Sequence, residues 1–65
     1  MFAQKVEIYT PDANTEVLAQ KDGVVYFYHN ISHVVTVCDD EENAIILQKG
    51  FGSKKSDAIA WVEAQ

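Results

Sequence analysis

The chain has 65 residues, with five Lys, no Arg, ten Asp plus Glu, a formal net charge of -5 and 48% hydrophobic residues. This length supports one small hydrophobic core, so we expect residues 1–65 to form a single domain, and the apolar content excludes an intrinsically disordered chain. Cys38 is the one cysteine, which excludes an internal disulfide.

The first half of the chain contains three predicted strands separated by turn residues. Residues 3–9 alternate in polarity and end at Thr10-Pro11-Asp12, a typical turn sequence. Residues 15–20 form a weaker strand, and Lys21-Asp22-Gly23 predicts a hairpin because Gly accepts a positive φ. Residues 24–29 form the strongest predicted strand, since they are almost all β-branched or aromatic.

The second half contains two more predicted strands and then a change of period. Residues 33–38 and 44–49 are rich in apolar residues and flank the acidic loop 39–43. Ser53 is placed to cap a helix over residues 54–64. The predicted fold class is α+β: an antiparallel β-meander of about five short strands, with one C-terminal α-helix packed on one face.

The predicted helix has an apolar stripe that includes Ile59 and Trp61. A helix of about 11 residues is marginal in water by itself. We therefore expect it to pack on the sheet, with Trp61 or Ile59 as the main insertion.

The three strands at 24–29, 33–38 and 44–49 are apolar on both faces, as is typical of strands that are buried on both sides. One short helix covers only part of one face. The second face then requires either a sheet that curls on itself or a second copy or partner protein. The residues that we expect at such an interface are Val24, Tyr26, Tyr28, Val35, Val37 and Ile46.

His29 and His33 are the candidate metal ligands, but the residues between them indicate a turn rather than a helix. The alternative interpretation is two partly exposed histidines at strand ends. Cys38 lies five residues beyond His33, roughly 16 Å away along an extended strand, which is too far for a shared metal ion. We therefore predict no metal and no cofactor.

A nucleophilic role for Cys38 is disfavoured, because Asp39 and Asp40 follow it and nearby negative charge suppresses the reactive thiolate. The acids of residues 39–42 indicate a solvated loop, with a docking patch for a basic partner as the alternative. The sequence contains no GxSxG, Walker or HExxH motif. We therefore expect a protein that is not an enzyme.

The segment Gly50-Phe51-Gly52-Ser53-Lys54-Lys55 combines glycines, a helix N-terminus and cations, a combination that favours an anion. From Gly50 to Ala60 it resembles the start of the last helix of double-stranded-RNA-binding domains, and the resemblance implies phosphate contact. A plain glycine-rich loop with a helix cap is the other interpretation. The candidate anion-binding residues are Lys49, Gly52, Ser53, Lys54 and Lys55.

These patterns favour a small non-enzymatic protein-interaction module that self-associates as a homodimer through the apolar sheet face. Small acidic proteins of this kind often serve as accessory or inhibitory factors in bacteria or phages, an association of composition rather than of chemistry. The alternative is a nucleic-acid or phosphate binder that uses the Gly50–Lys55 loop. We expect a cytoplasmic location, because no secretion signal and no apolar run long enough for a membrane span are found.

Overall fold

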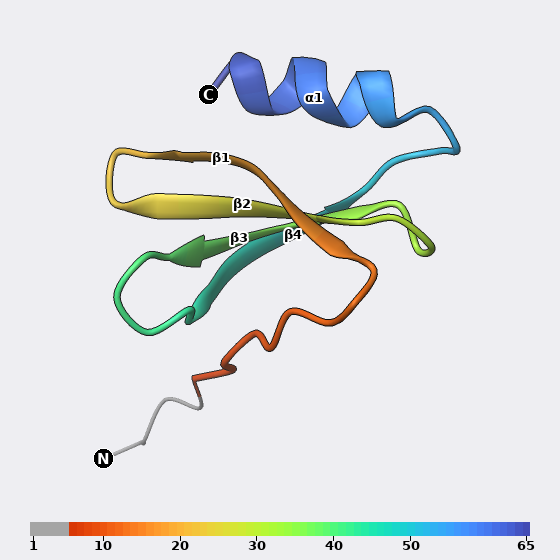
Figure 1. Ribbon diagram of the computed structural model, residues 1–65. Coiled ribbons are helices and arrows are strands. Elements are labelled where there is room, and N and C mark those ends of the chain that lie inside the picture. The colour runs from red at the N-terminus through yellow and green to blue at the C-terminus, as the bar shows by residue number, and fades with distance from the viewer. Residues whose placement is uncertain (1–5) are drawn as a thin grey trace.

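A computed structural model describes residues 6–65 and contains a four-stranded antiparallel sheet and one helix (Figure 1). The strands are β1 (Thr15–Lys21), β2 (Val24–His29), β3 (Val34–Asp39) and β4 (Ile45–Gly50), in the spatial order β1-β2-β3-β4. Helix α1 (Lys55–Glu63) lies over one face of the sheet. The predicted α+β meander is confirmed, with four strands in the described part of the chain rather than five.

The strand predicted at residues 3–9 is where the count differs. Residues 3–5 lie outside the described residues, and in residues 6–9 only Ile8 pairs, through an isolated antiparallel bridge to Ala44. Two backbone hydrogen bonds of 2.8 and 2.9 Å flank this bridge. The backbone of the segment pairs with the sheet only where β4 begins, so it builds no continuous ladder.

The predicted hairpin between β1 and β2 is confirmed as a two-residue turn. Asp22 and Gly23 have φ angles of 53° and 80°, so both lie in the left-handed region that this turn requires. His33 also has a positive φ, of 59°. This conformation interrupts extended backbone, which explains why β3 begins at Val34 and not at residue 33.

The predicted helix cap at Ser53 is wrong. The N-cap position is held by Lys54, and no side chain bonds to the free N–H groups there. The helix begins one residue later than predicted, which places the Ser53 hydroxyl one residue too early to serve as the cap.

The other end of α1 is bound to the sheet by a lysine. The Lys21 ammonium donates hydrogen bonds of 3.0 Å to the backbone carbonyls of Val62 and Gln65. A cation at this position also interacts favourably with the negative end of the helix dipole. Strand β1 is thereby fixed to the C-terminal turn of the helix.

The larger of the two buried clusters lies between the sheet and α1. Its buried members are Tyr26, Tyr28, Val35, Val37, Ala58 and Val62. Trp61 packs against this cluster, with ring centroids 6.3 Å from Tyr26 and 5.9 Å from Phe51. Of the two residues predicted to insert, Trp61 does so, whereas Ile59 stays 38% exposed.

The opposite face of the sheet carries a smaller cluster of Val25, Phe27 and Cys38. The ring of Tyr9 lies 5.1 Å from that of Phe27, and Ile45 packs alongside. The N-terminal segment runs on the side of the sheet away from α1 (Figure 1). This segment therefore covers part of the face for which the sequence required a curled sheet or a partner.

Candidate functional site

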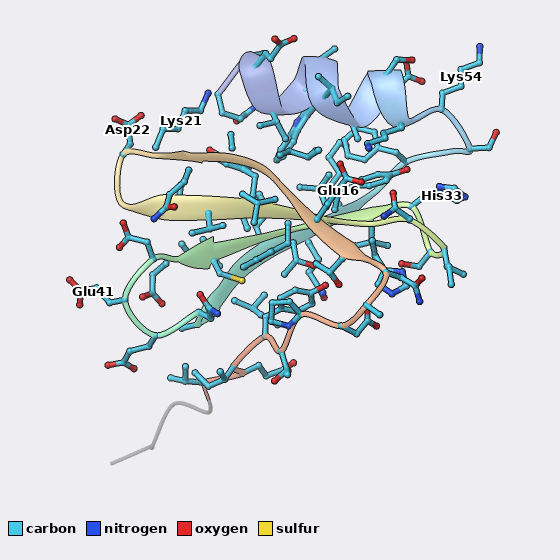
Figure 2. The ribbon with its side chains drawn as sticks, viewed as in Figure 1. Glu16, Lys21, Asp22, His33, Glu41 and Lys54 are labelled. Atoms are coloured by element: carbon cyan, nitrogen blue, oxygen red, sulfur yellow. The ribbon has the colours of Figure 1, made fainter. Side chains whose placement is uncertain are left out.

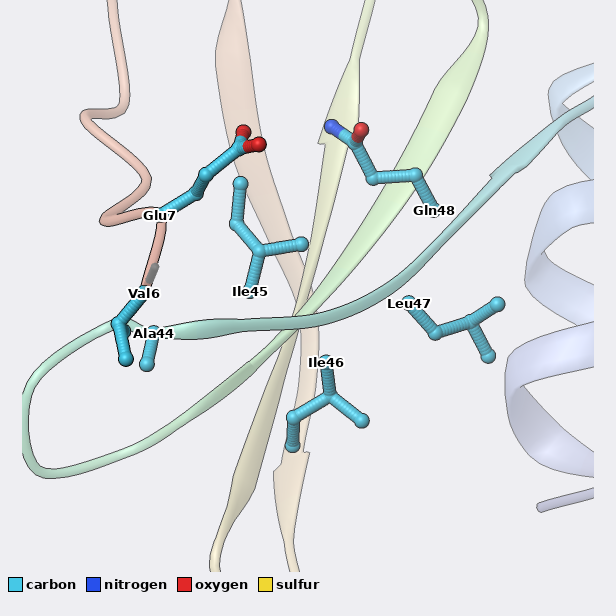
Figure 3. A pocket seen from close by; sticks show the side chains of 7 residues that line it. All are labelled: Val6, Glu7, Ala44, Ile45, Ile46, Leu47 and Gln48. Carbon is cyan, nitrogen blue, oxygen red and sulfur yellow. The ribbon is translucent and has the colours of Figure 1, made fainter. Parts of the chain in front are cut away.

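Strand β4 forms one edge of the sheet and borders an open groove of about 580 Å³ (Figure 3). The N-terminal segment and β4 line it together, through Val6, Glu7, Ala44, Ile45, Ile46, Leu47 and Gln48. Ile46 and Leu47 remain 60% and 46% exposed. Apolar side chains and an edge strand thus occur together at one place on the surface.

A β-bulge shapes this strand. Ile45 lies opposite Cys38 and Leu47 lies opposite the adjacent residue Val37, so Ile46 is an extra residue in the ladder. The extra residue lets Ile45 face the smaller cluster while Leu47 faces the helix side. In an uninterrupted strand, Ile45 and Leu47 would share a face.

Backbone hydrogen bonds establish which groups of β4 point away from the sheet. The Ile45 N–H donates outward to the N-terminal segment at 2.8 Å, and the Phe51 N–H donates inward to the β2–β3 turn at 2.8 Å. The bulge at Ile46 interrupts the alternation of inward and outward groups, so the alternation is counted back from Phe51. Lys49 and Leu47 then point inward like Phe51, and Gln48 and Gly50 direct their N–H and C=O outward. We call the outer side of Ile46–Gly50 the β4 edge; within residues 6–65 no strand lies beside it.

Opposite charges flank β4. The exposed acids Asp40, Glu41 and Glu42 precede the strand, whereas Lys49 and Lys54 lie at or beyond its other end. Figure 2 shows Glu41 and Lys54 at opposite ends of the molecule. The strand therefore runs from a negative region to a positive one.

Asp39 organises the acidic loop. Its carboxylate accepts backbone N–H hydrogen bonds from Glu41, Glu42 and Ala44, at 2.9, 2.8 and 2.8 Å. The bond from Glu42 contributes most to a pKa of Asp39 that lies below its ordinary value. This carboxylate is a structural acceptor, so the charges that the loop presents to solvent are those of the three acids after it.

Most of the residues predicted to form an interface lie beneath α1. Tyr26, Tyr28, Val35 and Val37 are buried, and Val24 packs against the same cluster. The helix of the same chain covers these side chains, which corrects the expected position of an interface. Ile46 is the one predicted interface residue that is exposed, and it lies at the β4 edge.

The predicted anion-binding segment is partly occupied by contacts within the chain. The Lys55 ammonium lies 2.6 Å from a Glu16 carboxylate oxygen and 5.7 Å from the centre of the Tyr28 ring. This bond lowers the pKa of Glu16. Lys49 extends over the Phe51 ring, at 5.6 Å. Lys55 is therefore directed toward β1 rather than toward a bound anion.

The remaining members of that segment, Gly52, Ser53 and Lys54, are exposed. Neither Gly50 nor Gly52 has a positive φ, and a Cβ added to either would meet no atom within 4 Å. The folded chain itself therefore gives no conformational reason for glycine at these two positions.

The two histidines have separate partners. The Nδ1 atom of His29 accepts the N–H groups of Ile31 and Ser32, so its Nε2–H donates to the Asp12 carboxylate at 3.1 Å. His33 Nδ1 lies 2.9 Å from the Tyr28 hydroxyl. In residues 6–65 the structure gathers no group of three or more candidate metal ligands.

Cys38 is fully buried in the smaller cluster. Burial, with a further contribution from the charge of Asp39, raises the pKa of its thiol. Both causes disfavour the thiolate, in line with the sequence argument against a nucleophile.

No protein-family model, curated protein or solved structure matches the chain. In the described range 6–65, no helix has the length and apolar character that crossing a membrane requires. The β4 edge is therefore interpreted from its own geometry. The sequence predicts Ile46 as an interface residue but does not identify Leu47 or Gln48. The run Ile45-Ile46-Leu47 was the signal for an exposed apolar side chain, because three consecutive residues of a strand cannot all lie on one face.

Proposed function

We propose that this chain is a small non-enzymatic protein-interaction module, an accessory or inhibitory factor that takes up an extended protein segment at the β4 edge. The observation that supports this is the outward N–H and C=O groups of Gln48 and Gly50 beside the exposed side chains of Ile46 and Leu47. In strand addition, backbone hydrogen bonds supply affinity and neighbouring side-chain contacts supply specificity.

Two features favour a protein over a nucleic acid as the partner. The chain has a net charge of -5, which opposes approach to a phosphate backbone. In addition, Lys55 pairs with Glu16 and Lys21 binds the end of α1, so these cations are engaged within the chain. A peptide strand satisfies the β4 edge directly, since it offers N–H and C=O groups at the same spacing.

Replacement of Gln48 by proline tests whether one outward backbone N–H of the β4 edge contributes to partner binding. Gln48→Pro removes an N–H that points away from β3, so the variant keeps the ladder within the sheet and loses the outward donor. Gln48→Ala is the matched control, because it loses the same side chain, including its 3.1 Å bond to Thr36, but keeps the N–H. Loss of outward hydrogen bonding should weaken partner binding by roughly tenfold or more.

The measurement is capture of proteins from a lysate by the immobilised chain, followed by amide hydrogen exchange on the captured complex. Capture by the wild type and Gln48→Ala but not by Gln48→Pro, with slower exchange at Gln48 and Gly50 in the complex, would support the proposal. Equal capture of another protein by all three chains would exclude the β4 edge as the site that binds it. Capture that nuclease abolishes and that Lys54→Glu removes would favour the nucleic-acid alternative.

A further inference from the structure

We infer that the segment taken up by the β4 edge is β4 of a second copy of this chain, antiparallel and related by a two-fold axis. This inference rests on the proposed function, because it names the partner for the same edge. Its basis is the distribution of charge along β4 and the part of the edge that is open.

The charges at the two ends of β4 match those of a second antiparallel copy. The exposed acids Asp40, Glu41 and Glu42 lie before the strand, and Lys54 lies beyond its end. Antiparallel pairing brings the acidic loop of each copy to the end of the strand where Lys54 of the other copy follows, and the symmetry repeats this match. Parallel pairing would place the two acidic loops together, which is unfavourable.

The charges also select the register. Centring the pair on Lys49 would place two ammonium groups directly opposite each other across the new ladder, which is destabilising. Centring it on Gln48 places Lys49 of each copy opposite Leu47 of the other. In that register the outward N–H and C=O of the two Gln48 residues face each other and form two hydrogen bonds.

The open length of the edge is consistent with this register. The N-terminal segment already bonds to the N–H of Ile45, so among residues 6–65 the stretch with no strand beside it begins at Ile46, and β4 itself ends at Gly50. A strand centred on Gln48 fills these five residues in both copies. Leu47, which is 46% exposed, then packs against the aliphatic stem of the partner's Lys49.

The test is solution mass from light scattering at two protein concentrations about a hundredfold apart, at constant salt. The wild type should approach twice its chain mass of 7.3 kDa at the higher concentration. Glu41→Lys and Lys54→Glu should each raise the dimer dissociation constant by roughly tenfold, because each places like charges together at both ends of the seam. The double variant Glu41→Lys plus Lys54→Glu keeps the net charge and restores opposite charges, so its dissociation constant should return toward that of the wild type.

Gln48→Pro should be monomeric at concentrations where Gln48→Ala still dimerises. A wild-type chain that stays monomeric throughout would overturn the second copy as partner, yet the proposed function would stand if Gln48→Pro still abolished capture of another protein. A dimer that persists in Gln48→Pro would overturn the β4 edge as the seam. A dimer that weakens further in the charge-swapped double variant would overturn the antiparallel arrangement.

Discussion

At the scale of single residues, several polar side chains accept hydrogen bonds from nearby backbone N–H groups. Asp39 accepts three backbone N–H groups, and His29 accepts two through Nδ1 while its other ring nitrogen donates to Asp12. A residue type that suggests a metal ligand or a general base in the sequence is thus used to hold a turn. Asp39 and His29 therefore stabilise the two turns at which they lie.

Asp39→Asn should remove a pH-dependent contribution to the free energy of unfolding. The pKa of Asp39 is lowered in the folded state, so its contribution is present above its ordinary pKa of 3.8 and is lost as the pH falls through the lower folded value. The difference in urea midpoint between the wild type and Asp39→Asn should therefore be larger at pH 7 than near pH 2. Glu41→Gln, on the same loop, is the control and should show a smaller difference at pH 7; equal effects of the two variants would contradict the role given to Asp39.

At the scale of elements, α1 depends on the sheet. It has nine residues and no side-chain N-cap, so it gains little from local interactions. Its attachment comes from Ala58 and Val62 in the larger cluster, from Lys21 at its C-terminal end and from the Lys55–Glu16 pair at its first residue. Strand β1 supplies both of these polar partners.

Val62→Ala should lower the free energy of unfolding by roughly 1–3 kcal/mol, because it removes buried methyl groups that the surroundings cannot replace. Ile59→Ala removes more atoms from an exposed position and should cost less than about 1 kcal/mol. Urea unfolding followed by Trp61 fluorescence measures both values. A larger loss for Ile59→Ala would mean that α1 presents a different face to the sheet.

At the scale of the whole molecule, the sheet lies between α1 on one face and the N-terminal segment on the other (Figure 1). The helix and the N-terminal segment differ in how extensively they contact the sheet. Six residues are buried between the helix and the sheet. The N-terminal segment is held by one bridge with two backbone hydrogen bonds beside it, and by Tyr9, which packs on Phe27 and has its hydroxyl 3.3 Å from that of Thr15. We expect the second face to open more readily than the first.

Tyr9→Ala should expose the smaller cluster and accelerate the reaction of the Cys38 thiol with an aromatic disulfide reagent. Cys38 is fully buried in the folded chain, so its reaction requires local opening. Loss of the aromatic pair should raise the rate by roughly tenfold or more. Ile31→Ala changes an exposed side chain on the β2–β3 turn and should leave the rate unchanged; acceleration in that variant too would indicate global rather than local opening.

The parts of the fold that sequence could predict are those set by neighbouring residues. The run of β-branched and aromatic residues after Gly23 places β2 at Val24–His29, as predicted. The spacing of Ala58, Ile59, Trp61 and Val62 identifies a helix that packs on the sheet, although Ile59 stays exposed. These features depend only on local conformation and periodicity.

The parts that could not be predicted depend on contacts between distant residues. Both faces of β2 and β3 are apolar, so nothing in their sequences indicates that α1 covers Tyr26 and Tyr28 rather than Val25 and Phe27. The Lys55–Glu16 ion pair joins residues 39 positions apart in the sequence. It directs toward β1 a lysine that was predicted to bind an anion. The β4 edge escaped prediction because the bulge at Ile46 changes which side chains and backbone groups face outward, and a bulge is visible only in the pairing.

The bulge at Ile46 also bears on how the length of this strand can vary between related genes. Ile45 and Leu47 already face opposite sides of the sheet, so a gene that lost codon 46 would encode a regular strand with every remaining side chain of β4 on its present face. Loss of codon 48 would instead shift the register by one residue. Either Lys49 or the residues before position 48 would then face the opposite side of the sheet. The strand therefore contains one residue more than its ladder needs, and natural variants one residue shorter at this point would keep the same two faces.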